Sequence, residues 1–147
     1  MNNYQQIVVG VDLSPESSQV LDRATQLSKL CQAEVHLVHV LEPLTFAYGG
    51  DIPMDLTEIQ SQLQSQAEQH LHKLADHFNI GKPHCHLLVG QPAAELHRIA
   101  EEQSADLIIV GSHGRQGLAL LLGSTANGVL HGANRDVLAV RVEEASA

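Results

Sequence analysis

Short, nearly uninterrupted runs of apolar residues constrain the fold of this chain more than any other feature. The runs fall at Gln6 to Val11, Ala33 to Leu41 and Ala105 to Val110, and they are rich in valine, isoleucine and leucine. Strands of a half-exposed sheet alternate apolar and polar residues, whereas parallel strands covered by helices on both faces read as continuous apolar runs. The sequence therefore predicts a parallel sheet that is buried on both faces.

Helical periodicity fills the segments between these runs. After the first run, Ser14 is predicted as the N-cap of a helix and Pro15 as its first helical residue. Two further helices are predicted at Asp55 to Phe78 and at Gln91 to Gln103, and the segment Glu42 to Met54, with its prolines and glycines, is predicted as a loop. The first helix carries an apolar stripe at three- and four-residue steps, as a core-facing helix does: Val20, Leu21, Ala24, Leu27 and Cys31.

Two more strands, predicted at His84 to Val89 and Asp136 to Val142, complete an alternating order of strands and helices. Right-handed crossovers then produce one α/β domain, an open, twisted, five-stranded parallel sheet with helices on both faces. The length of 147 residues fits a single domain, residues 1–147, with a sizeable core. In such folds ligands bind beyond the carboxyl ends of the strands, where the connections diverge to opposite faces.

A glycine-containing segment, Gly111 to Thr125, joins the third apolar run to a helix predicted to start at Gly123. Glycine allows the backbone to turn sharply and to approach a ligand closely, and the N–H groups of a helix start favour a phosphate. Taken singly, these features are also typical of an ordinary turn and helix start, but their order favours an anion site. The residues predicted to form it are Gly111, Gly114, Arg115, Gly123, Ser124 and Thr125.

The same segment resembles the nucleotide-binding loop of the universal stress protein family, which follows the pattern G-x2-G-x9-G-[ST]. Gly111, Gly114, Gly123 and Ser124 match that pattern, and the resemblance covers nearly the whole chain, including its first and last strands. Eight residues, Arg115 to Leu122, stand between the second and third glycines, where the family's ATP-binding pattern has nine. The resemblance implies the strand order 3-2-1-4-5, in which the first and fourth strands are neighbours.

The resemblance also implies a ligand, ATP or AMP, with or without Mg²⁺. It places Val11, Asp12 and Val40 at the nucleoside and the glycine-containing segment at the phosphates. From the residues alone, Asp12 could instead cap the turn at Ser14, and Val40 could simply pack in the core. Both interpretations stay open for each residue.

The last predicted strand, Asp136 to Val142, is expected at an edge of the sheet and is predicted to form a homodimer. An exposed edge presents unpaired N–H and C=O groups and invites a second strand, and a twofold contact satisfies both copies at once. The resemblance implies the same assembly, since members of the family commonly dimerise through this strand. The alternative is a monomer whose edge is shielded by the charges of Arg141, Glu143 and Glu144.

The charge balance, a formal net charge of −9, argues against polyanionic partners. Nonspecific nucleic-acid binding and attraction to anionic lipid both need a basic face. The apolar runs are too short to span a bilayer, and the polar start Met1 to Gln6 lacks the pattern of a signal peptide. With two cysteines, Cys31 and Cys85, in different predicted elements, we expect a reduced, cytoplasmic protein.

The run His84-Cys85-His86 is similar to a fragment of a metal site. His84 and His86 would share one face of a strand, but a structural zinc site usually has four ligands, and a third and fourth are not evident. A solvated or hydrogen-bonded surface without a metal is therefore predicted at this position.

No catalytic residue is predicted. His113 could act as an acid or base, but no nucleophile accompanies it. The chain also lacks the G-x-x-x-x-G-K-[ST] pattern of P-loop hydrolases and the G-x-G-x-x-G fingerprint of dinucleotide-binding domains. Together with the resemblance, these observations predict a cytoplasmic stress-response and signalling module that binds an adenine nucleotide as a homodimer and is not an enzyme. Two alternatives stay open: a nucleotide-free interaction protein of the same family with a shortened glycine loop, and a slow ATPase.

Overall fold

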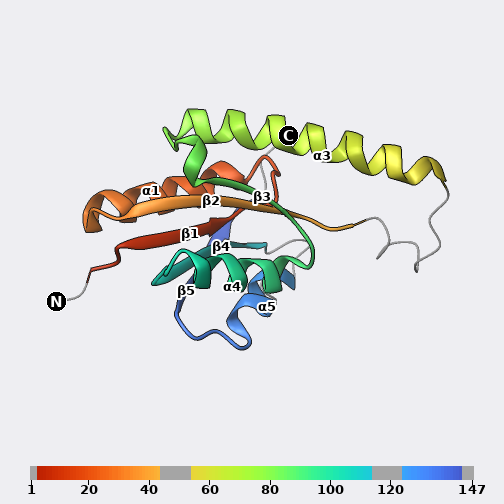
Figure 1. Cartoon of the computed structure of the whole chain (residues 1–147). Coiled ribbons are helices and arrows are strands. Elements are labelled where there is room, and N and C mark those ends of the chain that lie inside the picture. The colour runs from red at the N-terminus through yellow and green to blue at the C-terminus, as the bar shows by residue number, and fades with distance from the viewer. Residues whose placement is uncertain (1–2, 44–53, 114–123, 144–147) are drawn as a thin grey trace.

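A five-stranded parallel sheet with helices on both faces forms the body of the molecule (Figure 1). The computed structural model describes residues 3–43, 54–113 and 124–143. The strand order is β3-β2-β1-β4-β5 and every pairing is parallel, which confirms the predicted fold class and strand order. In chain order the elements are β1 (Gln6–Gly10), α1 (Ser17–Cys31), β2 (Glu34–Leu41), α3 (Met54–His77), η1 (Lys82–His84), β3 (Cys85–Val89), α4 (Pro92–Glu102), β4 (Leu107–His113), α5 (Ser124–Leu130) and β5 (Asp136–Val142).

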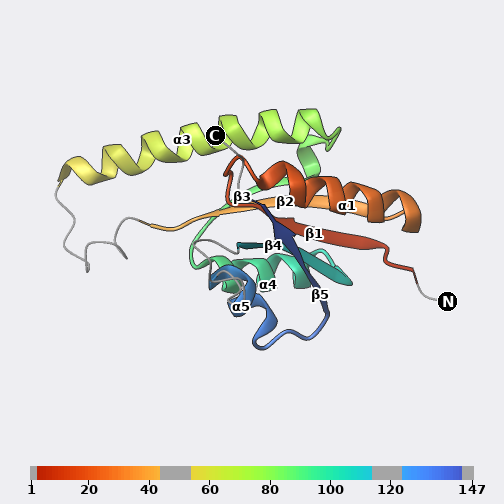
Figure 2. The ribbon, with the colours of Figure 1, turned by 180° about the vertical axis from the view of Figure 1, so that it is seen from behind.

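The helices form two layers, one on each side of the sheet, as Figures 1 and 2 show from opposite directions. α1 and α3 cover one face, and α4 and α5 cover the other. Successive residues of a strand point to opposite faces, so Ile7 and Val9 of β1 pack in the first layer and Val8 packs in the second. All three side chains are fully buried, which is why the apolar runs in the sequence are continuous. None of the helices in the described segments is long and apolar enough to cross a membrane.

The chain leaves β1 and β4 toward opposite faces of the sheet. β1 is followed by α1 on one face, and β4 is followed in the chain by α5 on the other. β1 and β4 are also hydrogen-bonded neighbours. A crevice therefore opens beyond their carboxyl ends, at the point where open α/β sheets bind ligands.

The start of α1 differs from the prediction that made Ser14 its N-cap. The helix begins at Ser17, and Glu16 occupies the N-cap position without a capping hydrogen bond from its side chain. The N–H of Ser14 instead donates to Oδ1 of Asp12 at 3.0 Å, which folds the chain into a tight turn before the helix. In that turn Leu13 takes a left-handed conformation with φ of 62°, which is uncommon for a residue other than glycine.

β4 is longer than predicted, because it continues past Val110 through Gly111 to His113. Gly111 pairs there with Val140 of β5, so the prediction that the chain turns at this glycine is wrong. The absence of a side chain serves packing instead: a Cβ on Gly111 would lie only 3.1 Å from Cγ2 of Val20 in α1. Gly111 thus lets α1 lie close against the end of β4.

Candidate functional site

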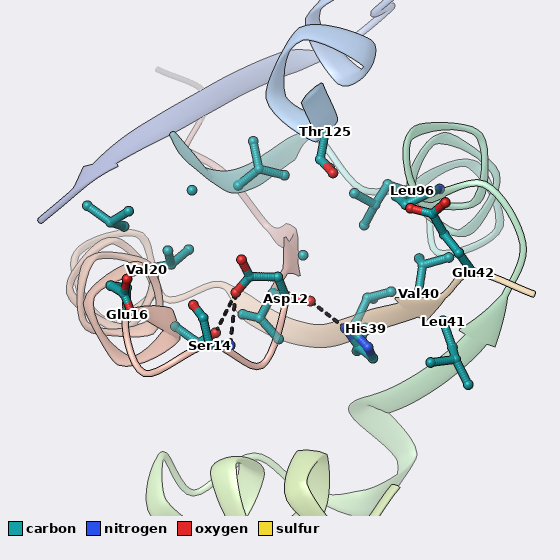
Figure 3. Close-up of a pocket in the computed structure, with 18 residues that line it drawn as sticks. Asp12, Ser14, Glu16, Val20, His39, Val40, Leu41, Glu42, Leu96 and Thr125 are labelled. Carbon is teal, nitrogen blue, oxygen red and sulfur yellow. Dashed lines mark hydrogen bonds between the residues drawn. The ribbon is translucent and has the colours of Figure 1, made fainter. Parts of the chain in front are cut away.

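A cleft of about 470 Å³ opens beyond the carboxyl ends of β1, β2 and β4 (Figure 3). Its volume lies within the range of small-molecule sites, roughly 300–1,000 Å³. The strand ends supply most of its apolar wall, and the turn between β1 and α1 supplies most of its polar groups. The lining residues named in the argument below are Val11, Asp12, Ser14, Glu16, Val38, His39, Val40, Glu42, Leu96, Val110, Gly111 and Thr125.

The carboxylate of Asp12 is held at the rim of this cleft by the turn that follows β1. Its Oδ1 accepts hydrogen bonds from the backbone N–H of Ser14 at 3.0 Å and from the hydroxyl of Ser17 at 3.2 Å. Asp12 itself is exposed. The prediction that Asp12 could support the turn at Ser14 is confirmed. These two bonds orient the carboxylate, whose oxygens only accept hydrogen bonds.

His39 joins the ends of β1 and β2 beside Asp12, and sequence analysis did not single it out. Its Nδ1 lies 2.7 Å from the carbonyl oxygen of Val11, as the dashed line in Figure 3 marks. Because a carbonyl oxygen only accepts, Nδ1 carries the proton. This bond fixes the backbone immediately before Asp12 and so helps to set the direction of its carboxylate.

Ser14 carries a buried hydroxyl at the same rim. Among the residues that the structure describes, its Oγ has no hydrogen-bond partner. A buried hydroxyl without a partner costs free energy, about 1–3 kcal/mol. A polar ligand group in the cleft, such as a sugar hydroxyl, would remove that cost.

The apolar wall lies opposite this polar rim. Val40 at the end of β2 is only 8% exposed and packs in the core layer under α4, while it also lines the cleft. Core packing, the alternative interpretation of Val40, is therefore confirmed together with its position at the cleft. Val11, Val38, Leu96 and Val110 extend the same surface. A wall of this kind suits a flat heterocycle better than a charged group.

The described part of the cleft is acidic, unlike the part that is expected to hold phosphates. Asp12, Glu16 and Glu42 line the cleft, and none of its described lining residues is lysine or arginine. Donor groups such as ribose hydroxyls and a base amine suit these carboxylates, whereas a bare phosphate would be repelled. The cation that sequence analysis assigns to the phosphates is Arg115, which lies outside the described residues.

The structure brings together five of the nine residues that the sequence predicted for this site. Val11, Asp12, Val40, Gly111 and Thr125 all line the cleft, although they come from four separate parts of the chain. Ser124 is the first residue of α5, and its side chain lies outside the described atoms. Gly114, Arg115 and Gly123 lie outside the described residues altogether.

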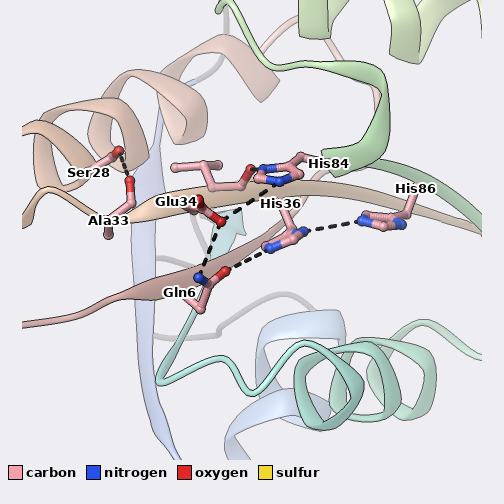
Figure 4. A network of polar contacts seen from close by, with 8 residues as sticks. Gln6, Ser28, Ala33, Glu34, His36, His84 and His86 are labelled. Atoms are coloured by element: carbon pink, nitrogen blue, oxygen red, sulfur yellow. Dashed lines mark hydrogen bonds and ion pairs between the residues drawn. The ribbon is translucent and has the colours of Figure 1, made fainter.

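A second polar cluster lies at the amino ends of β2 and β3 (Figure 4). The expectation that His84 and His86 share one face of a strand is wrong, because His84 ends η1 and β3 begins at Cys85. Both histidines form hydrogen bonds, as the prediction of a hydrogen-bonded surface implies. Sequence analysis missed the third histidine, His36 of β2, which lies between them: its ring stacks on His84 with centroids 4.3 Å apart and lies 5.5 Å from that of His86. Burial, reinforced by the two neighbouring histidines, lowers the pKa of His36 to about 4, against an opposing influence of Glu34.

Comparisons with known proteins agree with this geometry. Residues 3–141 match the model of the Universal stress protein family. The chain is 40% identical over 147 residues to Universal stress protein A homolog 2 of Coxiella burnetii, covering 97% of this chain and 99% of that protein.

Solved structures are similar over almost the whole chain as well. The structure of hypothetical protein MJ0577 has a TM-score of 0.80 and 25% identity, covering 98% of this chain and 100% of that one. A universal stress protein from Archaeoglobus fulgidus in complex with dAMP has a TM-score of 0.63 and 26% identity, covering 97% and 100% of the two chains. A universal stress protein in complex with cAMP has a TM-score of 0.59 and 26% identity, covering 95% and 98%.

Proposed function

Because the chain belongs to the universal stress protein family, we propose that its cleft binds an adenine nucleotide, ATP or AMP, and that the protein acts as a binding and signalling module rather than as an enzyme. The observation that carries the proposal is that one cleft has both an apolar wall at Val40 and an oriented carboxylate at Asp12. Two similar structures, solved with dAMP and with cAMP, support an adenine nucleotide as the ligand class.

The two sides of the cleft suggest how the nucleotide would lie. The adenine would pack against Val11 and Val40, and the carboxylate of Asp12 would accept hydrogen bonds from ribose hydroxyls. The phosphates would extend past Gly111 and Thr125 toward Gly114, Gly123 and Ser124 of the glycine-containing segment. Since the described lining is acidic, Mg²⁺ on the phosphates of ATP would offset part of the repulsion.

We expect replacement of Asp12 to weaken AMP binding at least ~10-fold, which corresponds to about 1.4 kcal/mol. Asp12→Ala removes both the ligand acceptor and the support of the turn, whereas Asp12→Asn keeps an oxygen that can accept from the Ser14 N–H. Isothermal titration calorimetry with AMP and with MgATP measures both variants against the unchanged protein. Asp22→Ala, at an exposed position of α1 that does not line the cleft, is the matched control and should bind as the unchanged protein does.

The outcome of that titration separates the candidate functions. The eight-residue spacing Arg115 to Leu122 favours the nucleotide-free interaction protein as the second candidate. Absence of binding heat with millimolar AMP and MgATP would establish that alternative. If nucleotide binds, phosphate release from ATP followed over hours tests for a slow ATPase, and our proposal expects none above the buffer rate.

We expect the protein to form a homodimer through β5. The free thiols of Cys31 and Cys85 favour the reducing cytoplasm as its location. β5 is an edge strand, and its Leu138 is only partly buried in the single chain. Sedimentation velocity at micromolar concentration should give twice the chain mass of 15.9 kDa. Leu138→Lys should shift the mass toward one chain, while Val89→Lys, on the opposite edge strand β3, should not. A monomeric unchanged protein contradicts this prediction.

A further inference from the structure

Three potential metal ligands converge at the amino ends of β2 and β3, at the opposite end of the strands from the nucleotide cleft. They are Glu34 and His36 of β2 and His84 of η1. One ligand atom from each lies within 4.8 Å of the others. Ligand atoms of a tetrahedral zinc ion with bonds of about 2.0–2.1 Å are about 3.3 Å apart. The three side chains would therefore have to move together, and the stacked rings of His36 and His84 would have to turn toward one point, to complete a site.

We propose that Glu34, His36 and His84 bind one first-row divalent transition-metal ion, of the class of Zn²⁺, with water in the fourth position (Figure 4). Two imidazoles with one carboxylate form a donor set that suits zinc and its neighbours in the periodic table rather than Mg²⁺ or Ca²⁺. His36 is 4% exposed, whereas the side chains of His84 and Glu34 are 34% and 61% exposed. The site would thus have a fixed inner ligand and an open path for the ion.

The hydrogen bonds of His84 prepare one ligand atom. Its Nδ1 lies 3.2 Å from the carbonyl oxygen of Val35, which can only accept, so Nδ1 carries the proton. The lone pair of neutral His84 is therefore on Nε2, the atom that lies 3.9 Å from Oε2 of Glu34. Metal-binding histidines commonly donate their other ring N–H to a backbone carbonyl in this way.

His36 has a corresponding partner in His86. Nδ1 of His36 lies 3.3 Å from Nε2 of His86, so when Nε2 of His36 binds the metal, Nδ1–H can donate to His86. His86 would then orient a metal ligand without binding the ion itself. The run His84-Cys85-His86 thereby has a role that the sequence alone did not show, with one histidine as ligand and the other as its support.

Gln6 contacts two of the three proposed ligands. Its Oε1 lies 2.9 Å from Nε2 of His36, and its Nε2 donates to Oε2 of Glu34 at 3.3 Å. The amide thus bridges two of the three ligands, as the dashed lines in Figure 4 mark. Metal binding requires Gln6 to move aside, so Gln6 competes with the ion.

Titration of chelator-treated, dialysed full-length protein with Zn²⁺ alone tests the proposal. We expect one equivalent of Zn²⁺ per chain by isothermal titration calorimetry. Affinity should fall at least tenfold in His84→Ala and in Glu34→Gln, which replace partly exposed side chains and so leave the core intact. Gln6→Ala should bind Zn²⁺ at least as tightly as the unchanged protein. The control is His70→Ala, on the exposed surface of α3, which should bind normally.

Thermal unfolding supplies a second readout that needs no assumption about function. An ion that binds only the folded chain raises the melting temperature, so Zn²⁺ should stabilise the unchanged protein and not the His84→Ala variant. Absence of stoichiometric binding would overturn the proposal. So would equal affinities of the unchanged protein and both ligand variants, because the ion would then bind surface histidines elsewhere.

Discussion

Through His36, the metal-free protein should lose about 3 kcal/mol of unfolding free energy as the pH falls from 7 to 4. The pKa of this histidine is about 4 in the folded chain and 6.5 in the reference state. Between these values the unfolded chain binds a proton that the folded chain does not, so acid favours unfolding. The contribution of His36 to stability is therefore complete above pH 6.5 and is lost as the pH falls toward 4.

The groups around His36 determine the direction of this effect. Burial is the largest cause of the lowered pKa, followed by the positive charges that His84 and His86 acquire on protonation, whereas Glu34 acts in the opposite direction. Burial also lowers the pKa of His86, with an opposing influence of Glu102. His86 thus adds to the loss of stability in acid.

Urea denaturation at several pH values, with a chelator present throughout, measures the effect. His36→Leu places an apolar side chain in the buried position and removes the titrating group. The stability of this variant should therefore fall less steeply between pH 6.5 and 4 than that of the unchanged protein. His70→Leu, on the exposed surface of α3, is the matched control and should keep the steep fall. Equal slopes for the unchanged protein and His36→Leu would contradict the prediction.

Arg135→Met should destabilise the fold by about 3 kcal/mol, because two carbonyl oxygens would lose a charged donor. The guanidinium side chain is 12% exposed and donates from Nη1 to the carbonyl oxygens of Ala100 at 2.9 Å and Ala105 at 2.7 Å. It also pairs with Glu101. Arg135 therefore ties the last turn of α4 to the segment before β4 and to the start of β5, and its positive charge suits a helix carboxyl end.

Arg98→Met is the matched control for this prediction. Arg98 pairs with Glu95 and Glu102 on the surface of α4, and its side chain is 50% exposed. Exposed pairs of this kind contribute little to stability. Urea denaturation should therefore show an unchanged midpoint for Arg98→Met and a lowered midpoint for Arg135→Met. Equal midpoints for the two variants would show that the bonds of Arg135 add no stability.

The order of strands and helices and the position of the cleft could be predicted from the sequence, because both follow from local patterns. Continuous apolar runs predict strands buried on both faces, and helical stripes between them predict parallel crossovers. Asp12 could be assigned to the cleft because it ends the first run, at the point where the connections diverge. Val40 was assigned through the resemblance to the universal stress protein family. The predicted start of α1 at Ser14 is wrong because Asp and Ser are both common at such turns. Here the side chain of Asp12 accepts the hydrogen bond from the backbone N–H of Ser14, and the helix starts later.

By itself, then, the sequence determined which segments become strands and helices, which faces they bury and which edge of the sheet forms the cleft. Tertiary structure alone decided which distant side chains meet. The parallel register that pairs Val38 with His86 places His36 beside His84, residues that are far apart in the chain. In the same way, β5 extends β4 to His113, and Arg135 reaches the carbonyls of α4. The physical reason is that register and helix docking are set by packing summed over the whole core, which no local pattern of residues contains.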